Sequence, residues 1–87
     1  MYYHDSLPHV ADFLRKISTD DMEDVLQDFL TPQEIVVLAE RIELFKQLKA
    51  GKTQREIAND MGISVTTVSR GNRVLQYGTG KIGKYVT

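Results

Sequence analysis

Cysteine is absent from the 87-residue sequence, which excludes disulfide bonds and metal sites built on thiolates. No apolar run approaches the ~20 residues that a membrane-spanning helix needs. The first ten residues lack the basic start and apolar stretch of a secretory signal peptide. We therefore expect a cytoplasmic protein that does not contact a membrane.

The residue sets typical of enzymes are missing as well. The sequence has no Ser-His-Asp or Cys-His arrangement and no phosphate-binding glycine loop. Its two histidines, His4 and His9, have no acidic residue at a metal-binding spacing. The acidic residues from Asp20 to Asp28 fall in the first turn or on the solvent side of an expected helix. No enzymatic activity, catalytic residue, metal site or cofactor is predicted.

Charge is distributed unevenly along the chain, although the net charge is only −1. Residues 1–47 hold ten acidic and four basic residues, a net charge of −6, whereas residues 48–87 hold two acidic and seven basic residues, a net charge of +5. A basic half favours a polyanionic partner. Simple solvation of both halves explains the pattern equally well.

Helix signals divide the sequence into short segments. Apolar residues recur at helical spacing after Pro8 and again from Met22 to Phe29. The N-terminal capping pattern recurs in three pairs, Ser18 with Asp21, Thr31 with Glu34 and Thr53 with Glu56, and Ser64 can cap a helix from Val65 to about Gln76. The sequence predicts an all-α fold of five to six short helices.

The most apolar helix is expected over about Pro32 to Lys49. One face carries Ile35, Leu38, Ala39, Ile42, Phe45 and Leu48, and Val37 and Leu44 widen this stripe on a second face. A chain of this length has a thin core, and dimerisation is a natural way to bury more apolar surface. This helix is therefore predicted to form the core and to contact a second subunit.

Two short helices joined across Gly62, in "QREIANDMGISVTTVSRGNRVL", have the helix-turn-helix pattern. Ala58 is small where the second helix crosses the first, and Gly62 suits a left-handed turn. Four apolar residues hold the helices together: Ile57, Met61, Ile63 and Val68.

The outer side of the second helix is polar. Thr66, Ser69 and Arg73 could face base edges in a major groove, and Gln54 and Arg55 begin the first helix, where phosphates are usually met. Double-stranded DNA is the predicted partner. The alternative is a helical hairpin used for protein contacts, in a dimerisation or adaptor module.

Gly71 lies inside the second helix, where glycine costs roughly 1 kcal/mol relative to alanine. Two explanations are open. The empty inner position beside Arg70 can leave a slot for a flat ligand that bears a carboxylate, or it can let the core helix pack closely. The residues alone favour close packing.

The segments "LTPQE", "LAERIELFKQLKAGKTQREIANDMGIS" and "TTVSRGNRVLQYG", roughly Phe29 to Gly78, resemble the Trp repressor family, most specifically in "SRGN". Members are intertwined, all-helical homodimers that bind operator DNA. In the tryptophan-sensing members, L-tryptophan is the corepressor and sits between the recognition helix and the dimer core. The resemblance implies one domain over residues 1–78, with its helix-turn-helix at about 53–76. The ending "YGTGKIGKYVT" is rich in glycine and weakly periodic, so residues 79–87 are expected to form a short, flexible tail with at most one more turn.

The resemblance also implies site residues. Arg41 and Arg70 match the arginines that sandwich the indole, with Arg70 also facing the carboxylate, and Gly71 matches the glycine that leaves room for the ring. Thr67 matches a pocket threonine, and Leu30 and Thr31 match the partner-subunit segment that lines the pocket. The family's DNA-contacting positions correspond to Gln54, Arg55, Ala58, Val65, Thr66 and Ser69.

Three departures bear on these expectations. Val74 stands where the tryptophan sensors carry a serine near the ligand's amino group, and an ammonium without an acceptor is costly. Carbonyls near Leu30 or the carboxylate of Asp28 are alternative acceptors. The "LQYGTG" ending is closer to less characterised relatives. The long C-terminal helix of the sensors has no counterpart, so dimer contacts are expected from the N-terminal helices and the core helix.

The resemblance therefore leaves three possibilities for control of DNA binding. They are L-tryptophan as corepressor, another small ligand, and a relative that binds DNA without any ligand.

Overall fold

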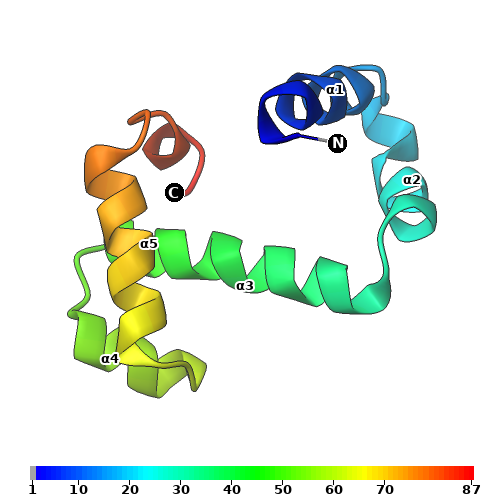
Figure 1. Cartoon of the computed structure of the whole chain (residues 1–87). Helices are drawn as coiled ribbons and strands as arrows, with labels where there is room; N and C mark the ends of the chain where they lie inside the picture. Colours follow the sequence, from blue (N-terminus) through cyan, green and yellow to red (C-terminus); the bar gives the residue numbers. More distant parts are fainter. Residues whose placement is uncertain (1) are drawn as a thin grey trace. The chain divides into compact units, whose positions relative to one another are not determined.

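The computed structural model describes residues 2–87, which fold into helices joined by short turns (Figure 1). The α-helices are α1 (Tyr3–Arg15), α2 (Met22–Phe29), α3 (Pro32–Lys49), α4 (Gln54–Met61) and α5 (Val65–Tyr77), and two 3-10 turns are η1 (Thr19–Asp21) and η2 (Ile82–Lys84). No strand occurs in residues 2–87, which agrees with the all-α prediction. None of the helices in this range is long and apolar enough to cross a bilayer.

The chain divides into two compact units. The first unit ends at Ile35 and contains α1, η1, α2 and the first turn of α3. The second unit runs from Val36 to Thr87 and contains the rest of α3 together with α4, α5 and η2. All residues of the predicted helix-turn-helix therefore belong to the second unit.

Helix α1 corrects the expectation of a helix that starts after Pro8. It begins at Tyr3 and includes Pro8. The backbone amide and the hydroxyl of Ser6 both donate to the carbonyl oxygen of Tyr2, at 2.8 and 2.7 Å, and close the first turn. Proline lacks the amide proton that would reach the carbonyl of His4. Because α1 has no buried residue, water can satisfy that carbonyl, and the helix tolerates Pro8.

In the first unit, α1 and α2 meet through the rings of Phe13 and Phe29, whose centroids lie 4.9 Å apart. Helix α3 then begins with a complete capping box. The Thr31 hydroxyl accepts from the Glu34 amide at 3.1 Å, and a Glu34 carboxylate oxygen accepts from the Thr31 amide at 2.9 Å. These bonds from Thr31 hold the pKa of Glu34 below its ordinary value. The predicted start of this helix is confirmed.

The core of the second unit lies where α4 and α5 pack against α3. Ile57 and Val68 are fully buried, and Leu44 and Ala58 complete the cluster, with Leu48, Met61 and Ile63 packed against it. Leu38 and Ile42, on the predicted apolar face of α3, are 43% and 51% exposed in the single chain, and the predicted contact of this face with a second subunit stays a prediction. The one buried residue of α3 is Leu44, on the second face. The reason is that α4 and α5 cover the Leu44 side.

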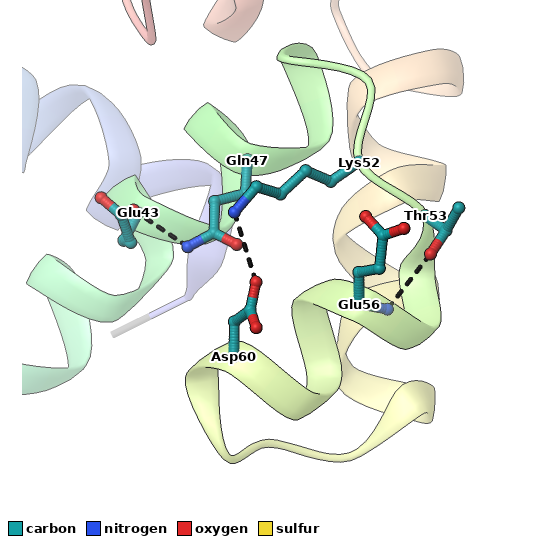
Figure 2. Close-up of polar contacts among 6 residues, drawn as sticks. All are labelled: Glu43, Gln47, Lys52, Thr53, Glu56 and Asp60. Atoms are coloured by element: carbon teal, nitrogen blue, oxygen red, sulfur yellow. Dashed lines mark hydrogen bonds and ion pairs between the residues drawn. The ribbon is translucent and has the colours of Figure 1, made fainter.

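The connection from α3 to α4 is fixed by polar contacts (Figure 2). The Thr53 hydroxyl accepts from the Glu56 amide at 3.1 Å and caps α4. Lys52 Nζ, before α4, lies 3.3 Å from Oδ2 of Asp60 in the last turn of α4, and both side chains are substantially exposed. An exposed pair of this kind contributes little to stability. The cap therefore does more than the ion pair to set where α4 starts.

The residues after α5 make specific contacts with the second unit. The Lys49 amino group donates to the carbonyl oxygen of Gly83, and a Cβ placed on Gly83 would lie 3.7 Å from the Leu75 side chain. Val86 is only 4% exposed. The segment predicted as a tail thus contains one buried side chain, while its flexibility stays a prediction.

Candidate nucleic-acid interface and ligand groove

The turn between α4 and α5 has the geometry that the sequence pattern indicates. Gly62 ends α4 with φ 67° and ψ 34°, the left-handed conformation that glycine adopts without strain. The Ile63 amide donates to the Ala58 carbonyl at 3.1 Å. The Ser64 hydroxyl accepts from the Thr67 amide at 3.1 Å and caps α5. Residues 62–64 therefore join two capped helices in a helix-turn-helix arrangement.

The outer face of this pair carries free polar groups. Arg55, Thr66 and Arg73 are exposed. Val65, the first residue of α5, is 50% exposed. None of the hydrogen bonds or ion pairs found within residues 2–87 uses the side chains of Arg55, Thr66 or Arg73. These side chains are available to a partner, and the two guanidinium groups suit phosphate.

Two predicted DNA-contacting residues contact each other. The Ser69 hydroxyl donates to Gln54 Oε1 at 2.5 Å, which joins the middle of α5 to the first residue of α4. Both side chains are half-buried. Ala58, in contrast, is 7% exposed and lies in the packed cluster of the second unit. The other six predicted DNA-contacting residues are at least partly open, and their role stays a prediction.

A groove of about 500 Å³ lies between α3 and α5. Its lining residues are Arg41, Leu44 and Phe45 from α3 and Thr67, Arg70, Gly71 and Val74 from α5. The fold thus brings together five residues that the sequence analysis proposed for a ligand: Arg41, Thr67, Arg70, Gly71 and Val74. Leu30 and Thr31 belong to the first unit, and their place in a ligand site stays a prediction.

Leu44 and Phe45 are lining residues that sequence reasoning did not assign to the site. A signal for them was present, because they follow Arg41 by three and four residues and so share its side of a helix. The sequence pattern indicates them only as core positions. Their apolar side chains give the groove an uncharged wall beside the guanidinium groups.

Gly71 is explained by the close approach of α3 and α5. A Cβ placed on Gly71 would lie 2.8 Å from Leu44 Cδ2 and 3.4 Å from Leu48 Cδ1. Close packing, which the residues alone favour, is therefore what the structure contains. Gly71 also lines the groove.

A smaller hollow of about 210 Å³ adjoins the groove. Its lining residues are Val37, Glu40, Arg41, Leu44, Met61, Ile63 and Thr67. It shares Arg41, Leu44 and Thr67 with the groove, so the two spaces meet along α3. Glu40 is the one acidic residue that lines either space.

Comparisons with known proteins find one family model and several relatives. The family model described as Trp repressor protein matches residues 6–86. A "Trp operon repressor homolog" of Xylella fastidiosa is 40% identical over 60 residues, 68% of this chain and 65% of that protein. "Uncharacterized protein YerC" of Bacillus subtilis is 37% identical over 65 residues, 71% of this chain and 62% of that protein.

A "Trp operon repressor homolog" of Photobacterium profundum is 34% identical over 70 residues, 78% of this chain and 68% of that protein. The chain spans 65% of the length of the Xylella relative, slightly less than two thirds. No solved structure matches the chain.

Proposed function

The chain belongs to the Trp repressor family, and on that premise we propose that it is a cytoplasmic, homodimeric transcriptional repressor that binds operator DNA. The observation that carries the proposal is the outer face of the helix-turn-helix, where Arg55, Thr66 and Arg73 are exposed and without a partner in residues 2–87. The protein acts by binding, and no catalytic step is assigned to it.

In this proposal, α5 lies in the major groove and presents Thr66 and its neighbours to base edges. Arg55 at the start of α4 and Arg73 on α5 neutralise phosphates, so affinity falls as salt concentration rises. The hydrogen bond from Ser69 to Gln54 keeps the two helices in register while they bind. A symmetric dimer is expected to prefer a palindromic site whose half-sites lie about one helical turn apart.

We further propose L-tryptophan as corepressor in the groove between α3 and α5. The Arg41 and Arg70 guanidinium groups suit a carboxylate, and Leu44, Phe45 and Val74 offer an apolar surface to an indole ring. A ligand at this place contacts both helices. The bound ligand would raise DNA affinity by increasing the population of the α5 orientation that fits the major groove of DNA.

The DNA proposal is tested by mobility shift on palindromic DNA at low salt, with and without L-tryptophan. Thr66→Glu places a carboxylate on the outer face and should abolish the shift. Gln76→Glu is the matched control, because it adds the same charge to the exposed last turn of the same helix, and it should retain most of the affinity. Arg55→Ala should lower the slope of log affinity against log salt by about one.

Two outcomes would contradict the DNA proposal. A wild-type protein that shifts no palindromic DNA at low salt, whether or not tryptophan is present, removes it. Equal binding by wild type and Thr66→Glu would assign the helix-turn-helix to protein contacts instead.

A second candidate is a DNA-binding relative that needs no ligand. The contact between Gly71 and Leu44 favours it, because the glycine is then explained by packing alone. Calorimetric titration of L-tryptophan separates the two candidates. Saturable binding of one ligand per subunit supports the corepressor, and a flat trace at millimolar ligand supports the ligand-independent protein.

A further inference from the structure

The groove and the adjoining hollow differ in charge. Arg41 and Arg70 line the groove, which has no acidic residue, whereas Glu40 lines the hollow. Arg41 lines both spaces. The positive charges of Arg41 and Arg70 in the groove therefore lie next to the negative charge of Glu40 in the hollow. Apolar side chains line the rest of both spaces.

The charged groups of these three side chains make no polar contact within the part of the chain that the structure describes. Within residues 2–87, no hydrogen bond or ion pair involves the side chain of Glu40, Arg41 or Arg70. Glu43, one turn further along α3, is different because its carboxylate accepts from Gln47 Nε2 at 3.0 Å (Figure 2). Glu40 thus keeps its acceptors free beside a space in which a ligand can be held.

We propose that Glu40 accepts the ammonium group of the bound amino acid, so that the groove and the hollow form one site for a zwitterion. The inference rests on the proposed corepressor function. Val74 offers no acceptor in the groove, and an ammonium group removed from water without a partner is costly. Glu40 is the only carboxylate that lines either space.

The adjacency of Glu40 and Arg41 fits this class of ligand. The ammonium and carboxylate groups of an α-amino acid are attached to one carbon atom, so their partners must lie close together. Consecutive residues that both line the hollow meet this requirement. The site would then select α-amino acids over apolar carboxylic acids of the same shape.

Calorimetry with two probes tests the inference on the full chain. The probes are L-tryptophan and indole-3-propionate, which lacks only the amino group. Glu40→Gln should lower affinity for L-tryptophan about tenfold or more, since the ion pair with the ammonium group is replaced by a weaker hydrogen bond to a neutral amide oxygen. It should leave the affinity for indole-3-propionate within about twofold, because that molecule has no ammonium group. Glu43→Gln lines neither space and should change neither affinity.

The outcomes distinguish this inference from the function on which it rests. Binding of L-tryptophan that is unchanged in Glu40→Gln leaves the corepressor proposal standing and overturns the role of Glu40. Equal weakening of both probes in Glu40→Gln, with unchanged helical circular dichroism, also overturns it, because the effect then does not depend on the ammonium group. Wild-type protein that binds neither probe overturns the corepressor proposal and the inference together.

Discussion

Replacing Gly71 with alanine sets two effects of known sign against each other. Alanine in place of glycine favours a helix by about 1 kcal/mol. The added Cβ would lie 2.8 Å from Leu44 Cδ2, and overpacking of this kind costs about 1–3 kcal/mol. Leu44 is only 6% exposed and has little free space except toward the groove. We expect Gly71→Ala to lower the free energy of unfolding by about zero to 2 kcal/mol.

A double-mutant cycle isolates the contact. Leu44→Ala alone should lower the free energy of unfolding by about 2–5 kcal/mol. In that background the clash is gone, so Gly71→Ala should raise it by about 1 kcal/mol. The coupling between the two positions is then about 1–3 kcal/mol. Urea unfolding followed by circular dichroism at one fixed protein concentration measures it, because association would make the midpoint depend on concentration.

One result would refute the reasoning. If Gly71→Ala stabilises the wild-type and the Leu44→Ala backgrounds by the same amount, α3 and α5 do not approach each other as described. Gly71 would then be left with its place in the groove as the only explanation.

Other contacts give three further tests. Hydrogen bonds with the amide and the side chain of Thr31 lower the pKa of Glu34. The stabilising effect of ionised Glu34 is therefore present above the ordinary pKa of 4.5 and is lost as pH falls through the lowered pKa. An NMR titration of Glu34 should give a midpoint below 4.5, and Thr31→Ala should move that midpoint upward. Ser69→Ala removes the hydrogen bond to Gln54 and should cost about 1 kcal/mol in chemical unfolding, while Ser69→Thr keeps the hydroxyl and should cost less. Val86→Ala shortens a side chain that is 4% exposed and should cost about 1–2 kcal/mol; an unchanged thermal midpoint would show that Val86 is not an anchor.

The boundaries of α3, α4 and α5 could be predicted because their causes are local. A cap and the amide it satisfies are three residues apart, as with Thr31 and Glu34 or Thr53 and Glu56, so both partners are visible in one short stretch of sequence. The left-handed turn at Gly62 is equally local. For this reason the positions of α3, α4 and α5 follow closely from the sequence.

The errors concern contacts between distant residues. The side of α3 that is covered within one chain depends on where α4 and α5 pack, and the apolar pattern of α3 alone did not indicate that this side is the one that carries Leu44. Val86 is buried although it lies in a glycine-rich segment of weak periodicity. The expected start of α1 after Pro8 was wrong for another reason. An exposed helix tolerates the missing amide of a proline, which a buried helix would not.

The start of α5 is capped by Ser64, a residue outside the exposed outer face of the helix. The Ser64 hydroxyl accepts from the Thr67 amide and marks where the helix begins, while the burial of Val68 against Ile57 and Ala58 sets which side of the helix faces inward. Val65 and Thr66 take no part in these contacts and stay exposed. Substitution of either residue is therefore expected to leave the packed face of the helix unchanged. If Val65 and Thr66 contact DNA as proposed, the preferred target can change through two adjacent codons while the scaffold stays the same.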